Sequence, residues 1–508
     1  MRLSIALLPC VLVMMAYAEA RSTFHPFRWN VKEELDFHHK RIITINGETP
    51  GPSIQGQQGD TVEVKVTNSL MEKLAILWYG VRQIGSPRYL RPILPGQTFT
   101  YHFILDQLGT HSYYSHYSMQ KAAGLYGGIR VLPPDGIAEP YAYDYEQSVI
   151  LNDWYNKSTN DGAFYWDGEP ASLQIQGKGK FDSFKSATPS SDTVAYNATI
   201  PAYLNWTVIP GKTYCLRISS VAIRYALSFQ IEGHNLTVVE ADGHYTEPFM
   251  AQNLFIYPGE TYSVLVKADQ DPLRSYWITS GNVGQDATST TPPGLNLLNY
   301  QPNHPKRVPP TDPPTGPIRN DVALQLAQTV AIKARQGYVR PPPPKADRVI
   351  MLLITRSKID GYFRWSMNYV SLTLPHMPCP ITLKENLHHV FDQHSPPNQQ
   401  PGFADYDMYG VANKTNATSS DSIYRLKVNT TVDIILQNAS TRTANNSETL
   451  PWHLHGHDFW VLGYGTGKFN VTNDPKKYNL VNPIMKDTVV VHPYGWTALR
   501  FVANKPGV

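Results

Sequence analysis

Short segments of alternating apolar and polar residues, each introduced by a proline–glycine turn, recur along this chain. Each segment has a Pro-Gly or Pro-x-Gly step, then Thr after one residue, then alternating apolar positions, at 95–99, 210–214, 258–262 and 493–497. A further alternating run at 59–66 has a counterpart at 428–435. Because side chains alternate between the two faces of a strand, this pattern predicts turns that lead into half-buried β-strands.

The repeats predict an all-β fold with three related β-sandwich domains, at residues 21–137, 138–310 and 311–508. Pro-rich stretches at 302–317 and 341–344 fit the crossing between the second and third domains. A chain of 508 residues is long for one domain and suits two to four. The 41 prolines and 34 glycines favour many short strands over helical bundles.

The spacing of the repeats also predicts that the third sandwich is incomplete. Gly96 is followed by Gly109-Thr110, where a strand towards His116 is expected, and Gly495 is followed at nearly the same interval by Gly507. The sequence ends one residue later, so we expect a truncated chain or gene model. A sandwich without its terminal strand exposes an apolar face and unpaired backbone groups.

Residues 1–20 have the pattern of a secretory signal peptide, with Arg2, an apolar run to Met15 and the small-x-small step Ala18-Glu19-Ala20. That run is too short to span a bilayer, and no later run is long enough. Ten glycosylation sequons predict an exported glycoprotein, although single triplets also arise by chance. They are at Asn156, Asn197, Asn205, Asn235, Asn413, Asn416, Asn429, Asn438, Asn445 and Asn470.

Charge and cysteine content narrow the function classes further. Lys and Arg number 44 against 41 Asp and Glu, and no basic tract stands out, so neither nucleic acid nor a charged membrane surface is an expected partner. After signal removal only Cys215 and Cys379 remain. One disulfide is possible, but cores of this size do not require it, and the pairing cannot be deduced from sequence.

The segment Trp452–His457 has three histidines at alternate positions, His453, His455 and His457. On a strand their side chains would share one face, and grouped imidazoles suit copper or zinc. The function therefore depends on which further ligands other strands bring to this segment.

Together these segments resemble the plant multicopper oxidases, and most closely their ascorbate oxidase branch. The resemblance covers nearly the whole mature chain and is strongest at 45–52, 80–85, 119–127, 239–243, 292–295 and 452–463. It implies three cupredoxin domains. It also implies a type 1 copper that takes electrons from a reductant, and a three-copper cluster between the first and third domains that reduces dioxygen to water. In the family, eight imidazoles from four His-x-His motifs hold that cluster.

Most positions that should provide copper ligands are substituted in this chain. The first motif is Leu77-Trp78-Tyr79-Gly80, the second is Tyr114-Ser115-His116, and the type 1 histidine of the third corresponds to Leu450. The fourth motif lies beyond Val508. Leucine cannot ligate, and a phenol with a pKa near ~10 is a poor exchange for imidazole.

The resemblance thus leaves three cluster ligands, His116, His453 and His455, and no type 1 ligand. It implies that His116 and His455 share one copper, and that His453 lies at the type 2 position with its partner replaced by Leu77. A weak copper site at His116 and His455 is one expectation. The other is that these imidazoles are satisfied by hydrogen bonds.

Trp166 and Trp365 correspond to the tryptophans that contact ascorbate in the family, and an indole suits a small ring-shaped ligand. The alternative is that both pack at a domain seam.

We therefore expect a secreted, extracellular homologue of these oxidases, in the apoplast or cell wall, with lost or strongly impaired oxidase activity and no assigned catalytic residue. Its expected partners are a small reductant such as ascorbate or a cell-wall or matrix component. One alternative is an active copper-dependent oxidoreductase that couples oxidation of such a reductant to reduction of dioxygen. Another is a nonfunctional fragment. The sequence does not determine the oligomeric state.

Overall fold

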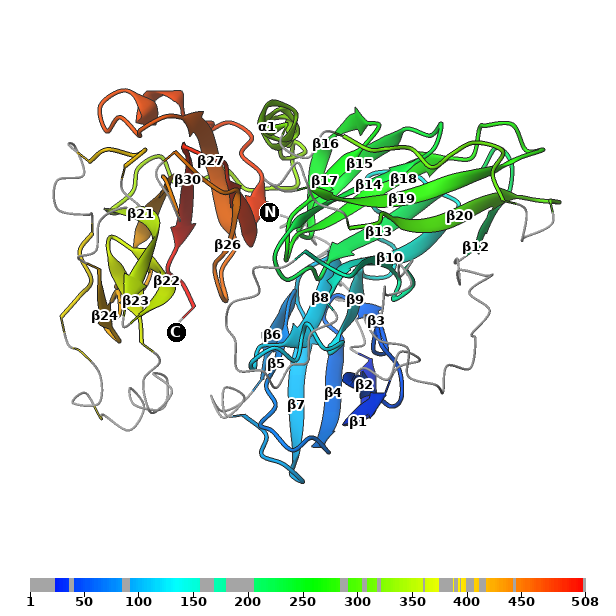
Figure 1. Cartoon of the computed structure of the whole chain (residues 1–508), viewed down its shortest axis with the longest axis horizontal. Helices are drawn as coiled ribbons and strands as arrows, with labels where there is room; N and C mark the ends of the chain where they lie inside the picture. The colour runs from blue at the N-terminus through cyan, green and yellow to red at the C-terminus, as the bar shows by residue number, and fades with distance from the viewer. Residues whose placement is uncertain are drawn as a thin grey trace, which may run out of the picture.

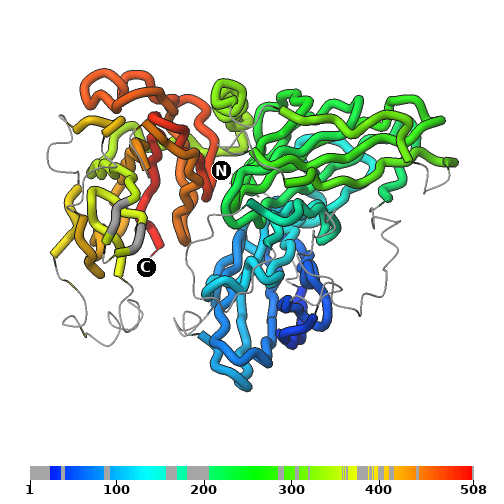
Figure 2. The backbone as a smooth tube through the Cα atoms, viewed as in Figure 1, coloured from blue at the N-terminus to red at the C-terminus, as the bar shows by residue number. Residues whose placement is uncertain are grey.

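The alternating segments form strands that pair into sheets in each third of the chain (Figure 1). In this computed structural model the described residues are 23–35, 41–84, 92–155, 169–179, 205–283, 291–303, 308–317, 321–359, 361–373, 387, 392, 394–398, 406–410, 417–441 and 445–505. The predicted signal peptide lies outside them. We number the three sandwiches domains 1, 2 and 3 in chain order. Figure 2 shows domain 2 in green at the upper right, domain 1 in blue and cyan below it, and domain 3 in yellow to red at the left.

Domain 1 is a sandwich of two sheets, in the orders β2-β1-β4-β7-β6 and β3-β9-β8-β5. Its strands are β1 (Phe24–Leu35), β2 (Arg41–Ile45), β3 (Ile54–Gln57), β4 (Thr61–Asn68), β5 (Ile76–Trp78), β6 (Val81–Gln83), β7 (Thr98–Leu105), β8 (Gly109–Ser115) and β9 (Tyr126–Leu132). Aliphatic and aromatic side chains from both sheets, with Trp29 and Trp78 among them, fill the space between the sheets.

Domain 2 has sheets in the orders β11-β10-β13-β18-β15-β16 and β12-β20-β19-β14-β17. Its strands are β10 (Tyr145–Trp154), β11 (Ser172–Ile175), β12 (Asn205–Val208), β13 (Thr213–Ser220), β14 (Ala226–Ile231), β15 (Leu236–Ala241), β16 (His244–Ala251), β17 (Leu254–Ile256), β18 (Thr261–Lys267), β19 (Ser275–Val283) and β20 (Gly294–Tyr300).

Domain 3 has a large sheet in the order β24-β23-β22-β21-β25-β30-β27-β28, and a second sheet with two described strands, β26-β29. Its strands are β21 (Arg348–Ile359), β22 (Tyr362–Met367), β23 (Val370–Leu372), β24 (Thr418–Ser420), β25 (Thr431–Asn438), β26 (Leu450–His453), β27 (Phe459–Thr466), β28 (Met485–Lys486), β29 (Thr488–Val491) and β30 (Gly495–Val502). A short 3-10 helix spans Asp474–Lys477. Gly507 and Val508, on which the predicted truncation depends, lie outside the described residues.

The internal repeat is visible in the strand pairing. In domain 1, β1 pairs with β4 in parallel and β4 pairs with β7 antiparallel; β10, β13 and β18 repeat this in domain 2, and β21, β25 and β30 in domain 3. The predicted turns lead directly into β7, β13, β18 and β30. The fold-class prediction is therefore confirmed: the chain is all-β, with three cupredoxin-like sandwiches.

The predicted half-burial of these strands is wrong for three of the four. Strand β7 alternates between exposed and buried positions, whereas β13, β18 and β30 are buried along nearly their whole length. For β13 and β18 the reason is that domain 1 covers their outer face: Thr110 of domain 1 contacts Ser263 of β18 at 3.2 Å between hydroxyl oxygens. Alternation along one strand cannot report such a contact between domains.

One α-helix, α1 (Val322–Ala331), lies in the described part of the chain, and its N-terminus is capped by the Asp321 carboxylate. It packs on domain 2, where the Gln328 amide donates to the Phe255 carbonyl at 2.7 Å. No described strand crosses the boundaries expected at 137/138 and 310/311, and the boundaries themselves stay a prediction. None of the helices in the described residues is long and apolar enough to cross a membrane.

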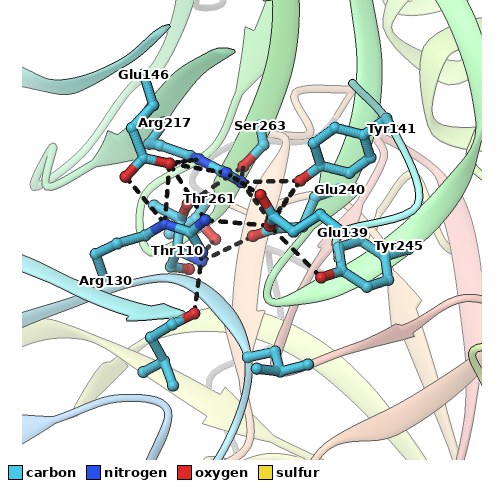
Figure 3. Close-up of polar contacts among 12 residues, drawn as sticks. Thr110, Arg130, Glu139, Tyr141, Glu146, Arg217, Glu240, Tyr245, Thr261 and Ser263 are labelled. Carbon is cyan, nitrogen blue, oxygen red and sulfur yellow. Dashed lines mark hydrogen bonds and ion pairs between the residues drawn. The ribbon is translucent and has the colours of Figure 1, made fainter. Parts of the chain in front are cut away.

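A buried ion network joins domains 1 and 2 (Figure 3). The Arg217 guanidinium on β13 pairs with Glu139 at 2.7 Å, Glu146 at 2.9 Å and Glu240 at 3.1 Å. Arg130 on β9 of domain 1 pairs with Glu139 at 3.1 Å and Glu146 at 3.2 Å. We call these five residues the junction network. Because charges taken out of water are costly unless paired, any displacement at this boundary that separates the pairs is unfavourable.

Candidate metal centre

The three retained histidines lie together where domain 1 meets domain 3. His116 directly follows β8, His453 ends β26, and His455 lies in the turn after it. The ring centroids of His116 and His455 are 5.1 Å apart, and those of His453 and His455 are 4.9 Å apart. His116 and His455 are exposed and His453 is half-buried. The sequence thus identified residues that the fold does bring to one place.

The prediction that all three histidines of the Trp452–His457 segment share one strand face is wrong. Strand β26 ends at His453, and Gly456 has a positive φ of 73°, which turns the backbone after His455. His457 packs instead on Phe501, with ring centroids 5.4 Å apart. A strand-like sequence pattern cannot show where a glycine ends the strand.

Two tyrosines occupy positions where the resemblance implies imidazoles, and the structure brings them together. Strands β5 and β8 are antiparallel with Leu77 opposite Tyr114, and the Tyr79 amide donates to the Ser112 carbonyl at 3.1 Å. Tyr79 and Tyr114 are therefore diagonal neighbours on one face. Their hydroxyls hydrogen-bond to each other and their ring centroids are 5.2 Å apart. We call these two residues the phenol pair.

The phenol pair also contacts domain 3. Tyr79 is only 8% exposed, and its ring centroid lies 4.9 Å from that of His453. The Nδ1 of His453 lies 3.1 Å from the Thr488 hydroxyl and 3.7 Å from the Asp487 carboxylate, both near the start of β29. These contacts orient the imidazole through its Nδ1.

The electrostatics of the site keep its phenols neutral. Burial raises the pKa of Tyr79 well above its ordinary value and raises the pKa of Tyr114 to about 12. His116 and His455 keep part of their surface accessible, but the protein around them removes water from the rings. This partial desolvation lowers the pKa of His116, and together with the neighbouring imidazoles it lowers the pKa of His455 to about 4. Burial alone would lower the pKa of His453, but Asp487 outweighs it and the pKa is raised.

These residues do not fit the three-copper cluster that the resemblance implies. Within the described part of the chain, no three His, Cys, Asp or Glu side chains are grouped so that they could hold a metal ion. Neutral phenols stand at two positions where the resemblance implies cluster imidazoles, and Leu77 stands at a third. Leu450 stands where the resemblance implies a type 1 ligand. Leu450 packs against the core shared by domains 2 and 3 instead. What remains is the adjacent pair of imidazoles at His116 and His455.

Of the two tryptophans predicted to contact a reductant, Trp365 lies within the described residues. Trp166 lies outside the described residues. Trp365 lies on β22, is 44% exposed, and has the Arg356 guanidinium 5.9 Å from its ring centroid. An indole that is this accessible could contact a small ligand, and its binding role stays a prediction.

Cys215 does not form the disulfide that the sequence left open. It is a free, buried thiol on β13, and burial raises its pKa to about 12. The other cysteine of the mature chain, Cys379, lies outside the described residues. A buried protonated thiol is unreactive, so Cys215 behaves as a small core side chain.

Two charged residues beside the phenol pair were missed by sequence reasoning. The Lys121 ammonium lies 4.1 Å from the Tyr114 ring centroid, and Asp487 contacts His453 as described above. Neither belongs to a His-x-His motif. The sequence did point to the phenol pair, because Tyr79 and Tyr114 stand at positions that correspond to the first and second His-x-His motifs of the family.

Three family models, all described as multicopper oxidase, match residues 28–136, 146–303 and 384–508. The chain is 42% identical to an L-ascorbate oxidase of Nicotiana tabacum, over 99% of this chain and 90% of that protein. It is 32% identical to Laccase-11 of Arabidopsis thaliana, over 92% of this chain and 85% of that protein.

Among solved structures, the laccase from Botrytis aclada superimposes with a TM-score of 0.74 and 25% sequence identity, over 96% of this chain and 84% of that one. Each of the three sandwiches contains a match to a family model, and the tobacco protein aligns over 99% of this chain and 90% of its own length. The chain therefore belongs to the multicopper oxidase family, and within it the chain is similar to the L-ascorbate oxidases of plants.

Proposed function

We propose that this protein is an extracellular, ascorbate oxidase-like protein that has lost the reduction of dioxygen to water and acts by binding. The family implies a copper cofactor, and this chain retains the family's fold. The observation that supports the loss is the phenol pair: two hydroxyls bonded to each other stand where two imidazoles would ligate copper.

Coordination chemistry supports the same conclusion. Protonated phenols and aliphatic side chains are poor or impossible ligands for the copper ions that imidazole binds. Changes to residues that merely orient metal ligands already cost about 10–100-fold in metal affinity or activity. Here Leu77, Tyr79, Tyr114 and Leu450 replace ligands themselves, so the loss is expected to be far larger.

The proposal is tested by oxygen uptake with ascorbate, using purified protein that has been incubated with copper and freed of unbound ions. Tobacco L-ascorbate oxidase, prepared in the same way, is the positive control. We expect uptake no faster than that of a copper-treated protein without this fold. Uptake that saturates with ascorbate and is sustained over many turnovers would overturn the proposal.

The extracellular location is supported by where the sequons lie on the fold. Of the sequon asparagines within the described residues, those at 205, 235, 429, 445 and 470 are exposed. Asn438 is fully buried and its amide donates to the Glu448 carbonyl at 2.6 Å. Together with the signal-like residues 1–20, this arrangement supports export. Immunodetection of the protein in extracellular fluid tests it, and retention inside the cell would contradict it.

The binding role is proposed for a small reductant such as ascorbate or for a cell-wall component. The exposed Trp365 is the described residue that supports the first. Calorimetric titration with ascorbate under nitrogen, with the Trp365→Ala variant as control, tests this role. Heat of binding that is the same in both proteins would exclude Trp365 from the site.

A second candidate function is that of an oxidoreductase with one mononuclear copper site. It is favoured by the adjacent, exposed rings of His116 and His455, with centroids 5.1 Å apart. Titration with Cu²⁺ followed by electron paramagnetic resonance tests it. Loss of the signal in His116→Ala and His455→Ala, but not in the distant His394→Ala, would support this site, whereas equal signals in all variants would exclude it.

A further inference from the structure

We propose that the phenol pair is a metal-free clamp that holds domain 1 against domain 3 at the place where the family uses copper. The inference concerns how the molecule is held together, and it goes beyond the proposed loss of oxygen reduction. Three sets of contacts support it, one to each domain.

The first contact lies within domain 1 and closes the pair. Each hydroxyl serves as the partner of the other, so neither the buried Tyr79 nor the half-buried Tyr114 leaves its oxygen unsatisfied. A buried polar group without a partner costs far more than a satisfied one contributes, and this arrangement removes that cost without an ion. Two substitutions that would each be unfavourable alone are therefore compatible together.

The second contact reaches domain 3. The Tyr79 ring packs on the His453 ring, and the interplanar angle of 57° is a tilted aromatic arrangement. His453 is held in turn by Thr488 and Asp487 near the start of β29. The phenol pair is therefore connected, through one imidazole, to the small sheet formed by β26 and β29.

The third contact reaches domain 2. Lys121, whose ammonium lies over the Tyr114 ring, donates to the Ala222 carbonyl of domain 2 at 3.2 Å. From the other side, the Thr488 amide donates to the Asp242 carboxylate of domain 2 at 3.4 Å. The contacts thus link domain 1 to domain 3, and each of these domains to domain 2. Every group in them is an ordinary side chain or backbone atom.

Native-state hydrogen exchange of the full chain measures this clamp directly. The amides of β26 and β29 report opening of the sheet that carries His453, because Leu450 to His453 pair with Val491 to Thr488. The variants are Tyr79→Phe, Tyr114→Phe and the double variant. The control is Tyr113→Phe, whose hydroxyl donates to the Pro52 carbonyl inside domain 1 at 2.8 Å.

We expect each single variant to speed exchange in β26 and β29 by roughly fivefold or more, since one buried hydroxyl loses its partner. The double variant should be no faster than the single variants, because both hydroxyls are gone together. Tyr113→Phe should leave these amides unchanged, and removal of metal with a chelator should not alter exchange in the unmodified protein.

Unchanged exchange in both single variants would overturn the clamp. So would a chelator that accelerates exchange in the unmodified protein to the level of the variants, because an ion would then hold the domains. Either result would leave the proposed loss of oxygen reduction standing, since that proposal is judged by oxygen uptake and not by exchange.

Discussion

Replacement of Arg217 by Met removes the centre of the junction network and tests how domains 1 and 2 are held together. Arg217 is 2% exposed and pairs with three carboxylates, while Met fills a similar volume without charge. Arg130 would still pair with Glu139 and Glu146. Glu240, which is fully buried, would lose its direct ion pair with Arg217. It would keep the hydrogen bond that the Thr110 amide donates to it at 2.8 Å.

The expected cost follows from that uncompensated buried charge. Removing one partner of a buried ion pair costs about 3–5 kcal/mol. For a folding unit of the size of domains 1 and 2 together, each kcal/mol of lost stability lowers the melting temperature by roughly 2–4 °C. Arg217→Met should therefore lower the melting temperature by at least roughly 6 °C. Addition of Glu240→Gln to Arg217→Met removes the stranded charge and should recover part of the loss.

Differential scanning calorimetry of the transition that contains domains 1 and 2 is the assay. The matched control is Arg82→Met, which breaks the exposed pair with Asp106 and should cost no more than about 1 kcal/mol. Equal shifts for the two Arg variants would refute the reasoning. A double variant less stable than Arg217→Met would show that the Glu240 charge is not the source of the cost.

Three further predictions test other parts of the account. Enzymatic deglycosylation that converts glycosylated Asn to Asp should mark the exposed sequons at 205, 235, 429, 445 and 470 and leave the buried Asn438 unmarked; a glycan on Asn438 would contradict the fold around it. Burial alone would raise the pKa values of Glu139 and Glu146, but Arg217 and Arg130 outweigh it and hold both below 4.5, so the stability they provide is present above about pH 4.5 and is lost as the pH falls further. Melting temperatures in acid buffers check this, and a protein equally stable below that range would refute it. Cys215 should react with a thiol reagent only after unfolding, because it is buried and its pKa is raised; rapid labelling of the native protein at this residue would contradict that.

Much of the fold was predictable because it follows from local rules. Turn residues at Pro95-Gly96 and Pro258-Gly259, and the alternation after them, identified strands β7 and β18 and the repeat to which they belong. The burial of β13 and β18 along nearly their whole length was not predictable. It results from contacts between domains whose residues are far apart in the sequence. The junction network is the clearest case, since Arg130 and Arg217 give no sign in sequence that they meet.

The sequence predicted that three histidines come together, but it did not predict the geometry around them. His116, His453 and His455 do come together, as the motifs indicated. What the sequence could not show is that Tyr79 and Tyr114 bond to each other, because that depends on the register of β5 and β8. The end of β26 at His453, set by the turn that follows, was missed for a similar reason.

The central claim is that Leu77, Tyr79 and Tyr114, at positions where the family resemblance implies imidazoles, prevent assembly of the copper cluster. It is tested most directly by the copper content of protein that has been loaded with copper and dialysed, measured by mass spectrometry beside tobacco L-ascorbate oxidase. The account predicts little bound copper and no magnetically coupled pair of copper ions. Copper at the level of the tobacco enzyme, with a coupled pair in its magnetic spectrum, would contradict it.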